Sequence, residues 1–152
     1  QSTTGYVISV LGSPVHWRSQ TQKTISLSSM ESEAYAATTT ACDCDWILSM
    51  VKEIGPAKPG ASYRIEMDSQ AAIARLSTQG LGRVRHAALR LAYLKQAVFE
   101  GRAQLIYKRT TSLVADVLTK HVSKQTIQTL RDGLSLKSHH VFRRSCAMPA
   151  AC

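Results

Sequence analysis

Residues 63–77 read YRIEMDSQAAIARLS, and their pattern indicates the fold class of the chain. Its first five residues alternate between apolar and polar side chains, the period of a β-strand with one buried face. Asp68 ends that strand, and the Asp68-Ser69 pair can cap a short helix over residues 70–77. A strand that leads directly into a helix starts a βα unit, which indicates an α/β fold.

Before this unit the sequence predicts two paired strands. Residues 6–11 (YVISVL) read as a strand, closed by Gly12-Ser13-Pro14. Residues 15–19 (VHWRS) alternate apolar and polar side chains, and residues 24–27 continue the extended character. We therefore expect an antiparallel hairpin at the start of the chain.

A long helix is predicted between the hairpin and residue 63. Ser28 and Glu31 fit a capping box, and Gly55-Pro56 ends the helix. Seven residues between them recur at alternating steps of four and three, which places them on one helical face: Met30, Ala34, Ala37, Ala41, Cys44, Leu48 and Val51.

After residue 77 the pattern alternates again between helix and strand. A helix is predicted over 86–99 with Gly101 as its stop, then a strand over 103–108. Helical patterns return at 112–119 and 124–132. The order is a mixed α/β pattern with an antiparallel start. We assign residues 1–136 to one domain and predict that 137–152, which show no clean period, form a disordered tail.

The composition favours a globular protein with an anionic partner. The chain has 152 residues, 44% of them hydrophobic, and a formal net charge of +9. No apolar run approaches the length of a membrane span, so no membrane partner is expected. Between residues 75 and 109, eight Lys or Arg residues face one acid, Glu100. Such a stretch suits a phosphate backbone, or else it is a solvated basic face.

The cysteines point to a reducing compartment. Cys42 and Cys44 are two residues apart, which is neither a zinc-ribbon spacing nor a disulfide framework. Reduced thiols in an intracellular protein are the simpler account.

Three acidic residues lie where predicted elements begin or end: Glu33 early in the long helix, Asp68 at the end of a strand, and Asp116 after the last strand. Functional groups gather at the carboxyl ends of strands in open α/β sheets, and converging carboxylates can hold two divalent ions for phosphodiester cleavage. Each acid also has a structural interpretation. Glu33 can complement the helix dipole, Asp68 can be an N-cap, and Asp116 can pair with Lys120.

Six short segments, in order along the chain, resemble the RNase H domain of copia-type retrotransposon Pol polyproteins. Residue for residue, they are similar to the family's STSGY, SWKSKKQ, LSSTEAE, YCDNQSAI, RTKH and QLADILTK: STTGY at 2–6, HWRSQ at 16–20 with Gln22, LSSMESE at 27–33, EMDSQAAI at 66–73, RVRH at 83–86 and LVADVLTK at 113–120.

The resemblance implies an RNase H-like mixed sheet flanked by helices, and hydrolysis of RNA in RNA–DNA hybrids with two Mg²⁺ ions. It implies that Glu33, Asp68 and Asp116 are catalytic metal ligands. It also implies that substrate contacts come from five further residues: Ser29, Gln70, Arg83, Arg85 and His86. The implied partners are the hybrid and the reverse transcriptase portion of the same polyprotein, in the cytoplasm or a virus-like particle.

The chain also departs from the family pattern. The family's first catalytic aspartate lies on a central strand that precedes the STSGY motif, whereas here Gln1 alone precedes Ser2. We therefore expect that strand and its aspartate to be missing from this chain and the fragment to be inactive. The acid that follows the family's RTKH motif is replaced by Ala87-Ala88, and the proline after LTK is replaced by His121.

Three hypotheses are compatible with the sequence. The chain is part of a nuclease domain of a retroelement; or it is a degenerate relic that binds nucleic acid without cutting it; or it is a helical interaction protein that exposes the stripe between residues 30 and 51.

Overall fold

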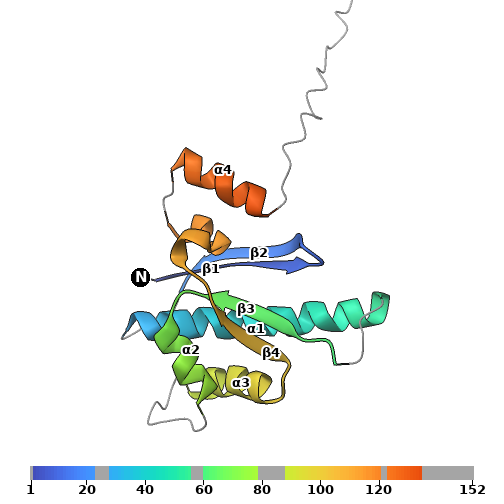
Figure 1. The fold of residues 1–152 in the computed structure, drawn as a ribbon. Coiled ribbons are helices and arrows are strands. Elements are labelled where there is room, and N and C mark those ends of the chain that lie inside the picture. Colours follow the sequence, from blue (N-terminus) through green and yellow to red (C-terminus); the bar gives the residue numbers. More distant parts are fainter. Residues whose placement is uncertain (1, 23–27, 56–59, 79–87, 121–122, 135–152) are drawn as a thin grey trace, which may run out of the picture.

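The computed structural model describes residues 2–22, 28–55, 60–78, 88–120 and 123–134. This part of the chain is a mixed α/β structure, as predicted (Figure 1). Its elements are β1 (Thr3–Val10), β2 (Ser13–Thr21), α1 (Ser29–Ile54), β3 (Tyr63–Met67), α2 (Gln70–Ser77), α3 (Ala88–Phe99), β4 (Ala103–Tyr107), the 3₁₀ turns η1 (Thr110–Ser112) and η2 (Val114–Leu118), and α4 (Lys124–Gly133).

The predicted antiparallel hairpin is confirmed. β1 pairs with β2 so that Tyr6 lies opposite Arg18 and Ile8 opposite His16. The turn between them has Leu11 and Gly12 at positive φ, which matches the twist of a tight hairpin. The buried side chains Tyr6 and Ile8 alternate along β1 and face α1. Residues 24–27, predicted as extended, lie outside the described residues.

The long helix begins and ends where its capping residues predict. The Oγ atom of Ser28 accepts a hydrogen bond of 3.2 Å from the Glu31 amide, and Gly55 is the C-cap. Most side chains of the predicted apolar stripe are buried. In the second half of the stripe the buried residue is Ile47 and not Leu48. Because this stripe is covered, the hypothesis of an exposed helical interaction face is wrong.

The segment from residue 63 to 107 is a βαβ arrangement whose strands are parallel. β3 pairs with β4 so that Ile65 lies opposite Leu105. The two intervening helices bury Leu76 of α2 and Leu94 of α3 in the same core as Ile65 and Ala41. The bounds predicted for β3 and α2 are confirmed to the residue, and Ser69 caps α2 by accepting from the Ala72 amide.

The described strands form two separate pairs that share one helix. β1 bonds to β2 and β3 bonds to β4, and no ladder joins β1 to β3 in the described chain. α1 packs against both pairs, so two neighbouring cores lie along its length (Figure 1).

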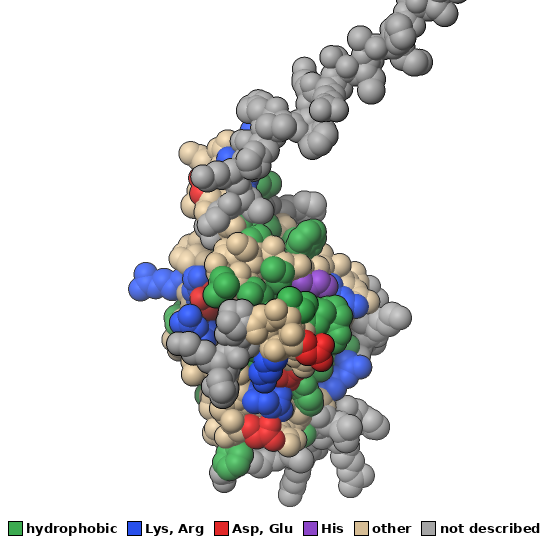
Figure 2. All heavy atoms as spheres, turned by 90° about the vertical axis from the view of Figure 1, so that its right-hand side faces the viewer, with side chains coloured by type: hydrophobic (Ala, Val, Ile, Leu, Met, Phe, Trp, Pro, Cys, Tyr) green, Lys and Arg blue, Asp and Glu red, His purple; other side chains and the backbone are tan. Residues whose placement is uncertain are grey.

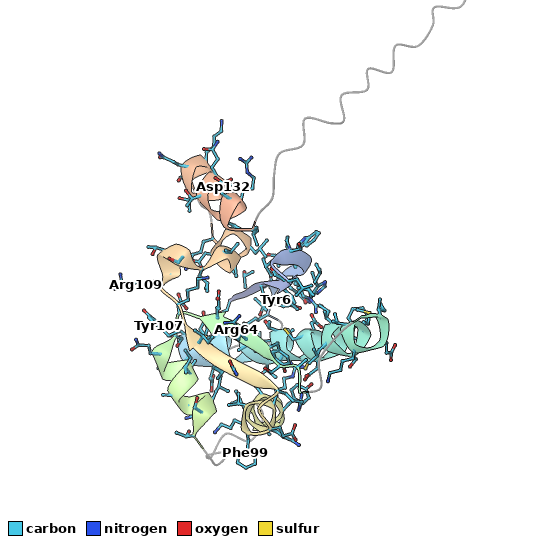
Figure 3. The ribbon with its side chains drawn as sticks, turned by 45° about the vertical axis from the view of Figure 1, so that its right-hand side comes forward. Tyr6, Arg64, Phe99, Tyr107, Arg109 and Asp132 are labelled. Atoms are coloured by element: carbon cyan, nitrogen blue, oxygen red, sulfur yellow. The ribbon has the colours of Figure 1, made fainter. Side chains whose placement is uncertain are left out.

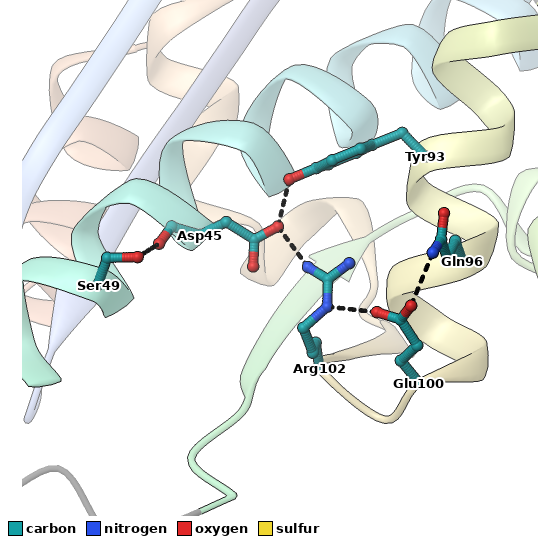
Figure 4. A network of polar contacts seen from close by, with 6 residues as sticks. All are labelled: Asp45, Ser49, Tyr93, Gln96, Glu100 and Arg102. Atoms are coloured by element: carbon teal, nitrogen blue, oxygen red, sulfur yellow. Dashed lines mark hydrogen bonds and ion pairs between the residues drawn. The ribbon is translucent and has the colours of Figure 1, made fainter.

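A polar network fastens α1 to α3 and to the start of β4 (Figure 4). The Asp45 carboxylate of α1 accepts hydrogen bonds from the Tyr93 hydroxyl and, at 2.7 Å, from Arg102. Arg102 also donates to Glu100 at 2.6 Å, and Glu100 accepts from Gln96. One guanidinium therefore bridges a helix and the loop before a strand.

The prediction of an α-helix over residues 112–119 is wrong. The chain forms two 3₁₀ turns there, η1 and η2, separated by extended backbone at Leu113. The β-branched residues Val114, Val117 and Thr119 disfavour a regular α-helix in so short a segment. The following helix, α4, is present close to its predicted bounds. The boundary predicted at residue 136 lies outside the described residues.

None of the helices in the described ranges is long and apolar enough to cross a membrane.

Candidate functional site

Chain topology brings the ends of β3 and β4 to one edge of their parallel sheet. Met67, the last residue of β3, accepts a backbone hydrogen bond of 2.9 Å from Lys108, which follows β4. Asp68 and the turns η1 and η2 therefore start from neighbouring points. In parallel sheets this carboxyl edge is where functional side chains collect.

Asp68 is held by the segment that follows β4. Its Oδ2 atom accepts a hydrogen bond of 2.8 Å from the Thr110 hydroxyl. The N-cap of α2 is the neighbouring Ser69, so the carboxylate of Asp68 does not serve as the cap. Sequence reasoning misses Thr110; its position just after β4, beside the residue just after β3, is the signal that identifies it.

Asp116 lies in η2, and its side chain is 16% exposed. Its Oδ2 atom lies 3.1 Å from Nζ of Lys120, four residues later. The ion pair that the structural interpretation of Asp116 predicts is therefore present. η2 packs against β1, where Gly5 allows close approach to Thr119.

Glu33 is partly buried in the second turn of α1, and its surroundings link the three acids. Burial raises the pKa of its carboxyl, and the negative charges of Asp68 and Asp116 raise the pKa further, while Lys120 opposes them. Only neighbouring groups exert such effects, because charges farther apart than about 10 Å are largely screened at an exposed surface. The three carboxylates thus share one electrostatic neighbourhood.

The chemistry of these donors suits a divalent cation, but they do not form a closed cage. Within the described residues, no three His, Cys, Asp or Glu side chains are arranged tightly enough to hold a metal ion. Two of the carboxylates are engaged by Thr110 and Lys120. Hard carboxylate oxygens are the ligands that Mg²⁺ prefers, and mutual repulsion among them is relieved by such an ion.

The residues predicted to contact substrate divide into two groups. Ser29 and Gln70 are exposed and are the first residues of α1 and α2. Ser29 therefore lies on the same helix as Glu33. Gln70 lies on the helix that is capped by Ser69, the residue after Asp68. Arg83, Arg85 and His86 lie outside the described residues.

The basic stretch between residues 75 and 109 is not one continuous free surface. Arg102 pairs with Asp45 and Glu100, and Lys108 lies 2.6 Å from Glu66. Arg90 stacks on the ring of Tyr35, with 4.6 Å from its guanidinium carbon to the ring centroid. Neighbouring acids therefore balance the charges of Arg102 and Lys108, whereas Arg90 contacts a ring.

A second polar cluster, which sequence reasoning does not anticipate, joins the hairpin to α1. Tyr6 lies between them (Figure 3), and its hydroxyl donates to the Asp43 carboxylate. Asp43 also lies 3.4 Å from Nε2 of His16 and 3.8 Å from Arg18. Burial and the hydrogen bond to Asp43 raise the pKa of Tyr6 to about 12, so the hydroxyl remains a donor at neutral pH.

Beyond this cluster, an apolar groove of about 560 Å³ runs between the hairpin and the end of α1. Val10 and Val15 line one side, and Trp46, Met50 and Ile54 line the other. Hydrophobic side chains gather around the histidine on this face (Figure 2). Trp46 is 63% exposed and Ile54 86% exposed.

The chain is similar to segments of curated polyproteins from plant transposons. It is 28% identical over 141 residues, 91% of its length, to the retrovirus-related Pol polyprotein from transposon TNT 1-94 of Nicotiana tabacum. It is 27% identical over 137 residues to that from transposon RE1, and 28% identical over 129 residues to that from transposon RE2, both of Arabidopsis thaliana. These matches cover 89% and 84% of the chain.

The chain spans about a tenth of the length of these relatives. No family model matches it, and no solved structure does. The similarity supports the interpretation that this chain is a segment of a retrotransposon Pol polyprotein.

Proposed function

We propose that this chain is part of an RNase H-like domain of a copia-type retrotransposon Pol polyprotein, and that the complete domain hydrolyses the RNA strand of RNA–DNA hybrids. Glu33, Asp68 and Asp116 are its metal-binding carboxylates. The observation that carries the proposal is the pairing of β3 with β4, which brings Asp68 to the segment leading to Asp116; in addition, burial and the charges of Asp68 and Asp116 raise the pKa of Glu33. Acids that are 83 positions apart in sequence, from 33 to 116, influence one another in space.

Two Mg²⁺ ions bound by these carboxylates would activate water and stabilise the leaving oxygen of the phosphodiester. The chain's own residues set the conditions for this binding. Thr110 orients Asp68, and Lys120 balances the charge of Asp116 and partly offsets the rise in the pKa of Glu33. Ser29 and Gln70, at the exposed starts of two helices, would contact the minor groove, where 2′-hydroxyls distinguish RNA from DNA.

The two strand pairs support the expectation that a further strand completes the sheet. β1 and β3 each use one edge for pairing and are not bonded to each other, although one helix supports both. A strand between them would join the pairs into one mixed sheet and could bring a fourth carboxylate to the site. Unpaired buried backbone groups cost about 1–3 kcal/mol each, so this strand would also stabilise the fold.

The test is a hybrid-cleavage assay on the chain alone and on the chain extended by any residues that its gene encodes before Gln1. We expect Mg²⁺-dependent cleavage of the RNA strand by the extended chain, and its loss in Asp68→Asn. Asp132→Asn, on the exposed helix α4, is the matched control and should cleave normally. An inactive extended chain that is folded, or activity that survives Asp68→Asn, would contradict the proposal.

A non-catalytic relic that binds nucleic acid is the second candidate. The engagement of Asp116 by Lys120 and the absence of a tight three-carboxylate group in the described ranges favour it. In that case the chain should bind hybrid with affinity that falls as salt is raised, and no cleavage should occur with Mg²⁺. Failure to bind at low salt would exclude this alternative.

A further inference from the structure

A hollow of about 430 Å³ lies where β2, α1 and α3 meet. Arg18 and Gln20 of β2, Tyr35 and Asp43 of α1, and Arg90 of α3 are among the residues that line it. None of the three carboxylates of the candidate site is part of its lining. Its volume is within the range of sites that hold small ligands.

The guanidinium groups of Arg18, on β2, and Arg90, on α3, border this hollow. Arg90 is exposed and lies over the ring of Tyr35. Such stacking uses the face of the guanidinium and leaves its N–H groups, which point outward in the plane, free to donate. The stacking also reduces the rotamer freedom that Arg90 would lose on binding a ligand.

The negative charge in the hollow is shared among several groups. Asp43 accepts a hydrogen bond from the Tyr6 hydroxyl and lies near His16 as well as Arg18. The separation of 3.8 Å between Arg18 and Asp43 is an ion pair rather than a short hydrogen bond, and the side chain of Arg18 is 44% exposed. The lining of the hollow contains two arginines and one carboxylate, so the hollow carries a positive excess.

We propose that Arg18 and Arg90 bind a phosphate group in this hollow, with the Gln20 amide as a further donor. The planar fork of arginine matches phosphate oxygens in a bidentate geometry, and charge-assisted hydrogen bonds of this kind are among the strongest in proteins. The phosphate belongs either to a nucleic-acid strand or to a free nucleotide. The proposal is independent of the carboxylate site and can hold even if the domain cuts nothing.

The experiment measures binding to the chain by fluorescence anisotropy with a labelled single strand of about 12 nucleotides, a length within the site sizes of single-strand binders, and by calorimetry with ATP. The variants are R18Q/R90Q, which removes both charges, and R18K/R90K, which keeps the charges but loses the fork. The control is K52Q/R64Q, which removes two exposed charges elsewhere. Circular dichroism checks that each variant is folded.

We expect R18Q/R90Q to weaken binding at least tenfold and R18K/R90K severalfold, with less than a twofold change in K52Q/R64Q. For a strand, the loss of one phosphate contact should reduce the salt-dependence slope by about 0.7. Losses with both probes indicate a general phosphate site, and a loss with the oligonucleotide alone indicates a strand site. Equal losses in the site and control variants, or no binding of either probe to the parent chain, would overturn the proposal.

Discussion

The Nζ atom of Lys120 lies 3.1 Å from Oδ2 of Asp116, and the same ammonium opposes the rise in the pKa of Glu33 that burial and the neighbouring acids cause. One cation therefore serves two carboxylates that the proposed function assigns to metal binding. An incoming divalent ion has to compete with this cation. The relationship makes Lys120 the most direct means of testing whether the acids act as one site.

Replacing Lys120 by Met should strengthen Mg²⁺ binding and raise the pKa of Glu33. The Lys120 side chain is 56% exposed, so its interaction is worth about 0.5–1 kcal/mol, or two- to fivefold in affinity. Calorimetric titration with Mg²⁺ gives the affinity, and NMR titration of the Glu33 carboxyl carbon gives the pKa. Lys124→Met, on α4, is the control and should change neither quantity. If neither the Mg²⁺ affinity nor the pKa of Glu33 changes in K120M, Lys120 is not part of the site.

Stability should depend on pH through Glu33. Its folded-state pKa is above its ordinary value, because burial and two acids oppose its charge. Its ionisation therefore disfavours the folded state at neutral pH, and this cost is relieved as the pH falls through the folded pKa towards the ordinary value. We expect Glu33→Gln to be more stable than the parent chain at pH 7, by a margin that shrinks as the pH approaches 4.5.

Urea unfolding of the parent and E33Q across this pH range measures the margin. Added Mg²⁺ at pH 7 should also reduce the difference in unfolding free energy between E33Q and the parent chain, because an ion bound to the carboxylates stabilises the parent chain and not the variant. A margin that is constant with pH and with Mg²⁺ would mean that Glu33 lies in an ordinary surface environment.

The sequence predicts those parts of the fold that local rules control. Ser28 and Ser69 cap helices, and the alternation of apolar and polar residues gives the bounds of β3. Both features can be recognised from a few consecutive residues. The helical spacing of small residues in α1 likewise predicts most of its buried face. Ile47 replaces Leu48 in that face because the hairpin, a distant segment, covers that side of the helix.

The sequence does not predict features that depend on contacts between distant segments. The pairing of Thr110 with Asp68 follows from the register of β3 against β4, and the Tyr6–Asp43 contact follows from how the hairpin lies on α1. The 3₁₀ turns at 110–118 resemble a helix in sequence because their apolar spacing is also compatible with 3.6 residues per turn. The proximity of Glu33 to Asp68 and Asp116 follows only from the family resemblance, since spacing along the chain cannot reveal it.

The network around Asp45 should contribute measurably to stability. Asp45 has a side chain that is 20% exposed and accepts from both Arg102 and Tyr93. Asp45→Asn removes the charge that Arg102 faces, and we expect a loss of about 1–3 kcal/mol in the free energy of unfolding. Ser49→Ala, one turn along the same helix, removes only an exposed hydroxyl that bonds the backbone, and should stay within about 0.5 kcal/mol. Urea unfolding of the two variants compares them, and equal losses would show that Arg102 gains nothing from Asp45.

η2 approaches β1 closely at Gly5. A Cβ atom at Gly5 would clash with Cγ2 of Thr119 and lie 3.1 Å from Cβ of Leu118. Gly5→Ala should therefore push η2 away from β1, with a cost of about 1–3 kcal/mol in unfolding free energy, as for other overpacked positions. Because Asp116 in η2 and the neighbouring Lys120 both influence Glu33, the displacement should also change the pKa of that carboxyl.

A double-mutant cycle separates this contact from a general effect of alanine in a strand. Thr119→Ser removes the Cγ2 methyl that alanine would meet, so it should recover part of the stability lost in G5A and return the Glu33 pKa towards the parent value. The contact of 3.1 Å to Leu118 remains in the double variant, which limits the recovery. Losses that simply add in the cycle would show that β1 does not position η2 through Thr119, and the placement of Asp116 would then need another cause.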